Sequence, residues 1–150
     1  MPLVHRAAEI LVVEDSPVDI RLISEALEEA GALVRIHIVE DGDAALAFLT
    51  DGELHGEAPR PDLILLDLNL PRRHGLEVLA EIRSDPVLRP IPVVVLSSSS
   101  AEGDVFRSYE LCANSYVTKS ADPEEFSSAV REICRYWLQI AQLPVTRPGM

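Results

Sequence analysis

Residues 63–71 read LILLDLNLP, in which four apolar residues are followed directly by Asp67. An apolar run without alternation is typical of a strand that is covered on both faces. Asp67 then stands where this strand ends, close to the core, and desolvation there penalises an isolated charge. The stretch therefore predicts a buried strand that ends on a carboxylate, and it indicates that this carboxylate has polar partners.

Four further runs have the same apolar character: Ile10–Val13, Val34–Val39, Val93–Leu96 and Tyr116–Thr118. Helical patterns alternate with them, and their first residues are typical of helix starts: Ser16-Pro17, Asp41, His74-Gly75, Ser100 and Asp122-Pro123. Strand followed by helix, five times over, predicts an α/β domain with a doubly wound parallel sheet between helix layers. We expect this domain over residues 9–143, tails at 1–8 and 144–150, and an exposed loop over 51–61.

The composition restricts the class of function. The 150 residues include 25 acidic and 13 basic side chains, and the net charge of −12 argues against a nucleic-acid surface. No apolar run approaches the roughly 18 residues of a membrane span, and the amino terminus does not resemble a signal peptide. Cys112 and Cys134 both lie in apolar helical patterns, so we expect two buried, reduced thiols in a cytoplasmic protein.

Polar residues follow the predicted strands at their carboxyl ends, where open α/β sheets bind ligands. They are Glu14 and Asp15, then Asp67 and Asn69, then the serines 97–100, and finally Lys119. Taken singly, each has an ordinary structural explanation as a helix cap, a turn residue or a solvated lysine. Together, three carboxylates at one edge repel each other, by about 3 kcal/mol for a pair about 5 Å apart at an effective dielectric near 20. Such a group requires a cation to stay ionised.

The types of ligand indicate which cation this is. Hard oxygen ligands without histidine or cysteine favour Mg²⁺ or a similar ion, which completes its shell with water and phosphate oxygens. The loop at 14–19, EDSPVD, has acids where a nucleotide-binding loop would have glycines and free backbone N–H groups. The edge therefore predicts a site for a metal ion and a phosphoryl group together, and not an ordinary nucleotide pocket.

Four segments in this order resemble the receiver domain of two-component response regulators: VVEDSPVD (12–19), LLDLNLPRRHGLEVL (65–79), VVVLSSSS (93–100) and YVTKS (116–120). The resemblance covers about residues 9–140. It implies a flavodoxin-like receiver fold with strand order 2-1-3-4-5 and five helices. It also implies that Asp67 accepts a phosphoryl group from a phosphohistidine of a sensor kinase.

The resemblance assigns roles to the other residues at this edge. Glu14, Asp15, Asp67 and the backbone carbonyl of Asn69 would hold Mg²⁺ or Mn²⁺. Ser97 would be the switch hydroxyl and Lys119 would pair with the phosphoryl oxygens. Two further expectations are that Ser98 contacts the phosphoryl group through its backbone N–H and that the rotamer of Tyr116 reports activation. The alternative for the serine run is a cluster of phosphorylation sites.

Two positions depart from the family pattern. Glu14 stands where the family most often has aspartate, and it is one methylene longer. Lys119-Ser120 replaces the usual Lys-Pro with its cis bond, and a cis bond before serine costs about 2.5–4 kcal/mol relative to trans. Either the chain retains this strain or the loop after Lys119 takes another path.

The implied function is a single-domain response regulator that catalyses only its own phosphorylation and dephosphorylation and signals through protein contacts. WLQIAQLP (137–144) and VEDSPVDIRLI (13–23) are similar to regulators that pair with bacterial and cyanobacterial phytochrome kinases. We also expect a homodimer through the fourth and fifth helices and the fifth strand, with Phe106, Tyr109 and Leu138 on its face. Trp137 is expected to pack on its own core.

Two other functions remain as alternatives. An aspartate-nucleophile phosphatase of the haloacid-dehalogenase type also uses a strand-end aspartate and Mg²⁺, but it needs a second aspartate two residues later as general acid. Asn69 occupies that position and cannot protonate a leaving group. The other alternative is a degenerate receiver that binds partners without phosphorylation, and the set Asp15, Asp67, Ser97 and Lys119 argues against it.

Overall fold

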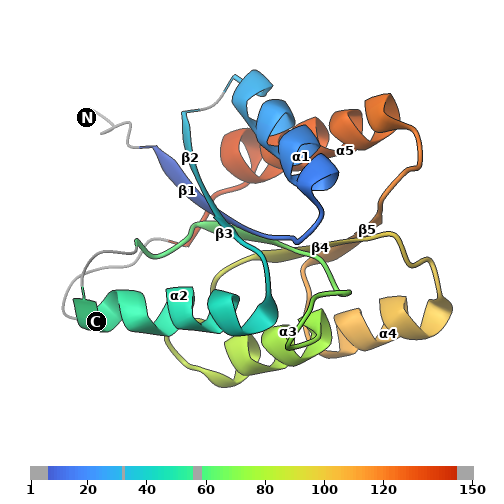
Figure 1. Cartoon of the computed structure of the whole chain (residues 1–150). Helices are drawn as coiled ribbons and strands as arrows, with labels where there is room; N and C mark the ends of the chain where they lie inside the picture. The colour runs from blue at the N-terminus through green and yellow to red at the C-terminus, as the bar shows by residue number, and fades with distance from the viewer. Residues whose placement is uncertain (1–6, 32, 56–58, 145–150) are drawn as a thin grey trace.

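The computed structural model describes residues 7–31, 33–55 and 59–144. Five parallel strands form one sheet in the order β2-β1-β3-β4-β5, shown in Figure 1. The strands are β1 Ala8–Val13, β2 Val34–Val39, β3 Leu63–Leu66, β4 Val93–Ser97 and β5 Ser115–Thr118. The predicted fold class and strand order are confirmed, and each predicted strand is found within two residues of its expected bounds.

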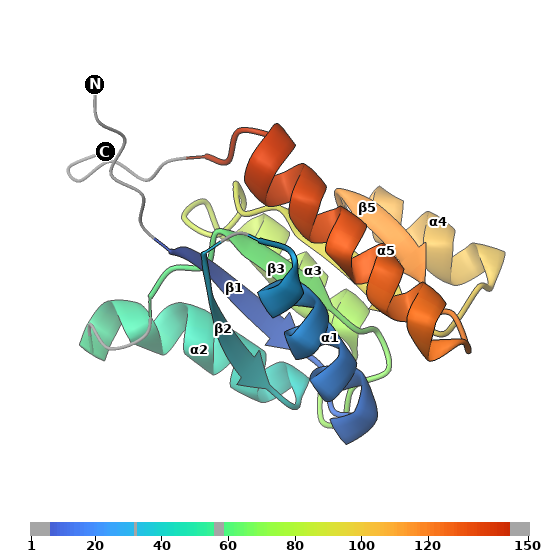
Figure 2. The same ribbon diagram turned by 90° about the horizontal axis from the view of Figure 1, so that it is seen from above.

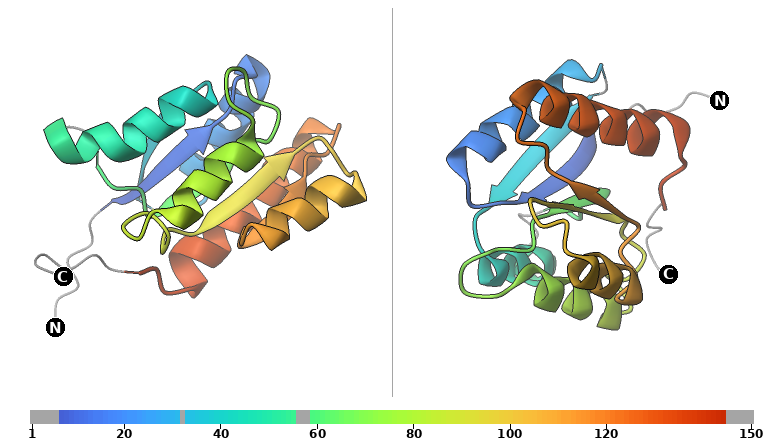
Figure 3. Two further views of the ribbon diagram at one scale, coloured as in Figure 1. Left: turned by 90° about the horizontal axis from the view of Figure 1, so that it is seen from below. Right: turned by 90° about the vertical axis from the view of Figure 1, so that its right-hand side faces the viewer.

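Helices cover both faces of this sheet. α1 (Pro17–Glu29) and α5 (Pro123–Arg135) lie side by side on one face, as Figure 2 shows from above. α2 (Gly42–His55), α3 (Gly75–Ser84) and α4 (Glu102–Glu110) lie on the other face, seen in Figure 3. A short π-helical segment, η1 (Tyr136–Ile140), continues α5. None of the described helices is both long enough and apolar enough to cross a membrane.

The apolar runs of the sequence build two separate cores. In β1, Leu11 and Val13 pack towards α2 and α3, whereas Ile10 and Val12 pack towards α1 and α5. β3 divides its leucines and Ile64 between the two cores in the same way. Successive side chains of a strand point to opposite faces, so a strand between two helix layers needs apolar residues throughout. The edge strands β2 and β5 are only half-buried, which differs from the expectation for all five strands.

Most predicted helix starts are confirmed by their caps. The Ser16 hydroxyl accepts a hydrogen bond from the Asp19 N–H, and the Asp122 carboxylate accepts one from the Glu124 N–H. Ser100 does not cap α4 as expected. The capping position is Ala101, which has no side chain for this purpose, and the hydroxyl of Ser99 accepts the Ala101 N–H instead.

Three other expectations are corrected by the fold. α2 continues to His55, so the first part of the predicted 51–61 loop is helical. β1 begins at Ala8, inside the predicted tail, while residues 1–6 and 145–150 lie outside the described residues. Cys134 is buried as predicted but Cys112 is exposed, because the chain turns there with a φ of 69° immediately after α4.

Leu138 also differs from its predicted place. We expected it to lie off the packed side of the last helix, as part of a dimer face. It is half-buried and packs against the core between the sheet, α1 and α5, together with Trp137. Leu138 therefore belongs to the packing of its own chain, and only Trp137 behaves as predicted.

Candidate functional site

The register of the sheet brings the predicted site residues together. Val13 of β1 pairs with Leu66 of β3, so Glu14 and Asp67 leave neighbouring strands side by side. The Asp67 N–H donates to the Val13 carbonyl at 3.0 Å, which continues the ladder to the carboxylate itself. The Lys119 N–H donates to the Ser97 carbonyl at 2.8 Å. All four side chains therefore stand at one edge of the sheet.

Three carboxylates converge at this edge. Glu14, Asp15 and Asp67 each offer an oxygen, and these oxygens lie within 4.8 Å of one another. Glu14 and Asp67 are only 2% and 6% exposed, whereas Asp15 is exposed. A set of hard oxygen donors with a solvent-facing member fits Mg²⁺ or Mn²⁺, which keep several waters. The predicted acidic cluster is therefore present.

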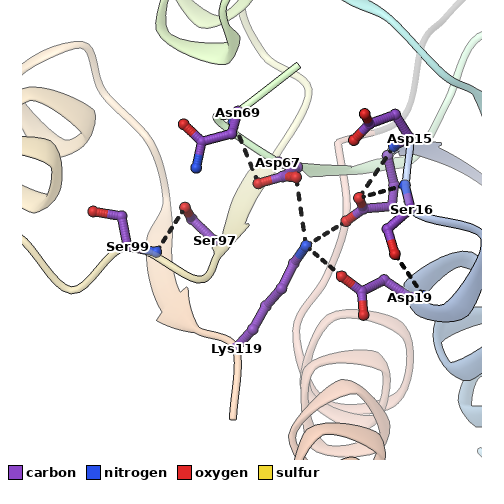
Figure 4. Close-up of polar contacts among 9 residues, drawn as sticks. Asp15, Ser16, Asp19, Asp67, Asn69, Ser97, Ser99 and Lys119 are labelled. Carbon is purple, nitrogen blue, oxygen red and sulfur yellow. Dashed lines mark hydrogen bonds and ion pairs between the residues drawn. The ribbon is translucent and has the colours of Figure 1, made fainter. Parts of the chain in front are cut away.

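Asn69 lies beside the buried aspartate. Its backbone N–H donates to Asp67 Oδ1 at 3.4 Å, as drawn in Figure 4. This bond orients the Asp67 carboxylate through the turn that follows β3. The role of the Asn69 carbonyl as a metal ligand stays a prediction.

Lys119 is the cation that faces these acids. Its Nζ lies 2.6 Å from Glu14 Oε1, 2.8 Å from Asp19 Oδ2 and 3.4 Å from Asp67 Oδ2. Its side chain is only 9% exposed, so these ion pairs are shielded from water. Figure 4 shows the ammonium group between the carboxylates of Asp67, just after β3, and Asp19 in α1.

Asp19 is a site residue that the sequence analysis did not single out, although it belongs to the acidic stretch at 14–19. A signal was present, since Asp19 lies in the first turn of a helix that begins at the ligand-binding edge. Its contact with Lys119 spans 100 positions of the chain and depends on how α1 packs. Spacing alone does not reveal such a contact.

Burial and pairing change the ionisation of two of these groups. Burial raises the pKa of Glu14, and the charge of Asp67 raises it further, against the lowering effect of the Lys119 hydrogen bond. For Lys119, burial alone would lower the pKa, but hydrogen bonds to Asp19 and Glu14 and the charge of Asp67 outweigh it and raise the pKa. Lys119 is therefore held in its charged form, as a contact to phosphoryl oxygens requires.

The two carboxylate oxygens of Glu14 have different hydrogen-bond partners. Oε1 accepts from Lys119, and Oε2 accepts from the backbone N–H groups of Asp15 and Ser16, each at 3.1 Å. Both Glu14 oxygens are therefore hydrogen-bonded. The glutamate side chain is one methylene longer than that of aspartate, and it reaches Lys119. Asp15 is exposed, and the two bonds that Asp67 accepts, from Asn69 and Lys119, are longer than those of Glu14, at 3.4 Å each.

The predicted switch residues meet on the other side of Asp67. Ser97 is fully buried and its hydroxyl accepts the Ser99 N–H at 3.2 Å. The Tyr116 hydroxyl donates to the Ser99 carbonyl at 2.7 Å. Ser98 is exposed, and its role as a phosphoryl contact stays a prediction. Ser99, which had no predicted role, therefore joins the two predicted switch residues, Ser97 and Tyr116.

The peptide that follows Lys119 is trans, since the described residues contain no cis bond. The Ser120 hydroxyl accepts the Asp122 N–H at 3.1 Å and donates to Glu125 at 2.8 Å. Ser120 thus stabilises the start of α5 through its side chain. Lys119 therefore reaches the predicted site with a trans peptide bond after it.

A doubly wound parallel sheet with a buried strand-end aspartate, flanking acids, a buried serine hydroxyl and a paired lysine is the arrangement expected of a receiver domain. The family model of the response regulator receiver domain matches residues 10–131, and the chain belongs to this family.

Known proteins resemble the chain over most of its length. It is 48% identical over 135 residues to the response regulator Rcp1 of Synechocystis, which covers 90% of this chain and 92% of Rcp1. The crystal structure of the phosphorylated cyanobacterial phytochrome response regulator RcpA is 49% identical, with a TM-score of 0.89 over 93% of this chain and 100% of RcpA. The Mn²⁺-bound form of Rcp1 is 47% identical, with a TM-score of 0.87 over 92% of this chain and 99% of that chain. The predicted family and the finer likeness to phytochrome response regulators are confirmed.

Proposed function

We propose that Asp67 accepts a phosphoryl group from the phosphohistidine of a sensor histidine kinase, and that the phosphorylated chain signals through protein contacts. The observation that supports this most directly is the setting of Asp67. Its carboxylate is buried at the end of β3, and it has Lys119 at 3.4 Å and two further carboxylates beside it. An isolated aspartate would be penalised there, so its partners imply a chemical role.

The chemistry needs little covalent machinery. An Asp67 oxygen attacks phosphorus in line, an O–P bond forms, and the N–P bond to the kinase histidine breaks with its electron pair returning to the imidazole. Lys119 donates to the phosphoryl oxygens, and Asn69 holds the nucleophile through its N–H. Most of the acceleration then comes from charges that are already in position.

A divalent ion is part of this proposal. Asp15, Asp67, Glu14 and the Asn69 carbonyl are the groups that would hold Mg²⁺ or Mn²⁺. When bound, the ion supplies positive charge to the phosphoryl oxygens as they approach three carboxylates. The oxygen-only donor set and the existence of a Mn²⁺-bound form of the related Rcp1 support this assignment.

The kinase is proposed to be a phytochrome. The support is the similarity to RcpA, which is described as a cyanobacterial phytochrome response regulator. The test is phosphotransfer from a purified red/far-red photoreceptor kinase, compared with a histidine kinase that senses no light. Equal transfer from both kinases would contradict the phytochrome assignment and leave the phosphoacceptor role intact.

We further propose that the chain has no phosphatase activity towards other substrates. The residue two positions after Asp67 is Asn69, which cannot act as a general acid. The test is turnover of p-nitrophenyl phosphate in Mg²⁺ buffer. Sustained turnover that disappears in Asp67→Asn would favour the phosphatase alternative.

The central experiment is incubation with acetyl phosphate and Mg²⁺, followed by intact-mass measurement. We expect the wild type to gain the mass of one phosphoryl group, and Asp67→Asn to gain none. Asp85→Asn, on the loop after α3 and remote from the site, is the matched control and should gain the same mass as the wild type. Chelation of the metal should suppress the gain. No gain in the wild type, or an equal gain in Asp67→Asn, would refute the proposal.

A further inference from the structure

Ser99 contacts three different parts of the molecule with its three polar groups. Its N–H donates to the Ser97 hydroxyl at 3.2 Å, and its carbonyl accepts the Tyr116 hydroxyl at 2.7 Å. Its own hydroxyl donates to Asp104 Oδ2 at 2.6 Å, in the first turn of α4. One residue of the β4–α4 loop thus joins the switch serine, the switch tyrosine and a helix.

The start of α4 is weak without this contact. Its capping residue, Ala101, offers no side-chain acceptor, and serine, threonine, aspartate or asparagine there would contribute about 1 kcal/mol. Gly103 lies in the first turn, and glycine costs about 1 kcal/mol relative to alanine inside a helix. The helix also buries little, because Ser108 is its single fully buried residue and Phe106 is 67% exposed. Apolar packing therefore fixes the first turn only weakly.

The Ser99 hydroxyl compensates for both defects. It accepts the Ala101 N–H at 3.3 Å, which replaces the missing cap. Its bond to the Asp104 carboxylate is short and charge-assisted, and bonds of this kind are about twice as strong as neutral ones. The neighbouring serines Ser98 and Ser100 are exposed, so the position of Ser99 within the run is specific.

We infer that the Ser99 side chain is a positioning group that fastens the first turn of α4 to the switch loop, so that changes at Ser97 and Tyr116 reach α4 through the Ser99–Asp104 hydrogen bond. The part that concerns phosphorylation rests on the proposed function. A plain helix cap would stabilise α4 equally in both states of the protein. A coupling residue must also change how α4 responds when Asp67 is phosphorylated.

The first test uses the unphosphorylated protein and amide hydrogen exchange of peptides covering residues 101–106. Ser99→Ala keeps the backbone bonds to Ser97 and Tyr116 and removes only the hydroxyl. We expect exchange in the first turn of α4 to become about tenfold faster in Ser99→Ala and faster in Asp104→Ala, with the double variant no faster than Ser99→Ala. Ser99→Thr keeps the hydroxyl and should stay near the wild-type rate, as should Ser100→Ala. Wild-type rates in both Ser99→Ala and Asp104→Ala would overturn the inference.

The second test repeats the exchange after acetyl phosphate treatment, with intact mass giving the phosphorylated fraction of every sample. We expect the phosphorylation-dependent change over 101–106 to fall below about half its wild-type size in Ser99→Ala, while peptides containing Tyr116 still respond. A full-sized response of α4 in Ser99→Ala would overturn the coupling. If the wild type gains no phosphoryl mass, the proposed function fails, and the first test still decides whether Ser99 fastens α4. If Ser99→Ala does not fold, Asp104→Asn provides the same comparison with the loop serine intact.

Discussion

At the scale of single residues, Lys119 neutralises a group of acids that its own side chain helps to bury. Replacing it with methionine keeps the volume and leaves Glu14, Asp19 and Asp67 without their cation. Removing one partner of a buried ion pair costs about 3 kcal/mol or more. We expect Lys119→Met to lose about that much free energy of unfolding in metal-free buffer, measured by urea unfolding.

The metal separates this effect from a general packing defect. Because the proposed Mg²⁺ site includes Glu14 and Asp67, saturating Mg²⁺ should restore part of the stability of Lys119→Met. Lys119→Arg keeps the charge and is the matched control, with a smaller loss. A loss in Lys119→Met that Mg²⁺ does not reduce would contradict the proposed overlap of the ion-pair and metal sites.

The two cysteines give a prediction for alkaline pH. Burial raises the pKa of the Cys134 thiol above its ordinary value of 9.0. In the folded protein this thiol stays neutral, while in the unfolded chain it loses its proton above about pH 9. The contribution of the neutral Cys134 thiol to the free energy of unfolding is therefore fully present below about pH 9. It is lost as the pH rises further, by up to about 1.4 kcal/mol per pH unit.

The measurement is urea unfolding between neutral pH and pH 10 for the wild type, Cys134→Ala and the exposed-site control Cys112→Ala. Because other groups of the chain also ionise at alkaline pH, the comparison concerns the slopes of the unfolding free energy against pH and not its absolute values. We expect the wild type and Cys112→Ala to share the steeper slope and Cys134→Ala to have a shallower one. Equal slopes in all three proteins would show that Cys134 does not contribute.

The residues that could be predicted from the sequence are those fixed by strand ends. Asp67 and Lys119 each directly follow an apolar run, so their place at the edge depends only on recognising the strands. Asp19 and Ser99 depend on helix packing and on the path of a loop, and neither leaves a periodic pattern. Cys112 was misplaced because its neighbours continue the apolar pattern of α4 while the backbone has already turned.

At the scale of the elements, two glycines allow a matched prediction. A Cβ on Gly75 would collide with the backbone carbonyl of Asp67 and with Leu68, so the start of α3 must lie against the turn that follows β3. A Cβ on Gly103 in α4 would meet nothing within 4 Å. We expect Gly75→Ala to lose about 2 kcal/mol or more of stability and most of the phosphoryl gain.

Gly103→Ala, in the first turn of α4, should instead gain up to about 0.5–1 kcal/mol, because alanine restricts the unfolded chain and favours the helix. Urea unfolding and intact mass after acetyl phosphate treatment measure both variants. Similar losses in the two variants would contradict the claim that the contact with the Asp67 turn, and not glycine content, makes Gly75 essential.

Arg83 stabilises the end of the sheet opposite the candidate site, where β4 and β5 begin. Its guanidinium donates to the carbonyls of Cys112, Arg89 and Ile91 and to Asn114 Oδ1, at 2.7 to 2.9 Å. It thereby joins α3, the segment before β4 and the turn before β5, and burial lowers its pKa. Lysine cannot make this planar set of bonds.

We therefore expect Arg83→Lys to lose about 2–3 kcal/mol of stability, measured as a lower urea midpoint with an unchanged slope. Arg21, which forms an exposed pair with Glu25, is the control. Arg21→Lys should change stability by less than about 0.5 kcal/mol. A loss in Arg83→Lys no larger than this control would show that the Arg83 bonds contribute nothing measurable.

The existence and type of each element followed from patterning, but several ends did not. α2 runs beyond Phe48 into a polar stretch with no apolar period, so the pattern ends before the helix does. The start of α4 was misplaced by one residue because Ser99 caps it from the loop instead of from the capping position. A side chain that reaches forward in this way looks the same in the sequence as a loop serine.

At the scale of the whole molecule, the parallel topology of the sheet brings residues that are far apart in the sequence together in one site. Five strands with parallel register place every strand end at one edge, so residues more than 100 positions apart meet without long loops. The strand order came from the family resemblance, since alternation of strands and helices alone is compatible with other orders. Which outer surface binds a partner depends on side-chain exposure, and there the sequence interpretation was partly wrong.

Association of two copies is the prediction at this scale. Of the three residues expected on a dimer face, Leu138 packs inward, whereas Phe106 and Tyr109 on α4 are 67% and 49% exposed. The Tyr109 hydroxyl accepts the Tyr116 N–H at 3.2 Å, so its ring is held in place at the edge formed by α4 and β5. Exposed aromatic side chains such as Phe106 and Tyr109 are enriched at the centres of interfaces.

We expect a concentration-dependent dimer in sedimentation equilibrium, with a dissociation constant at least about tenfold weaker in Phe106→Ser. Because Phe106 is largely exposed, this variant should keep the wild-type unfolding midpoint. Val87→Ser, an exposed apolar residue after α3, is the matched control and should dimerise as the wild type does. A wild type that stays monomeric at high concentration, with and without acetyl phosphate, would refute the dimer. An equal effect of Phe106→Ser and Val87→Ser would exclude the α4–β5 surface as its specific face.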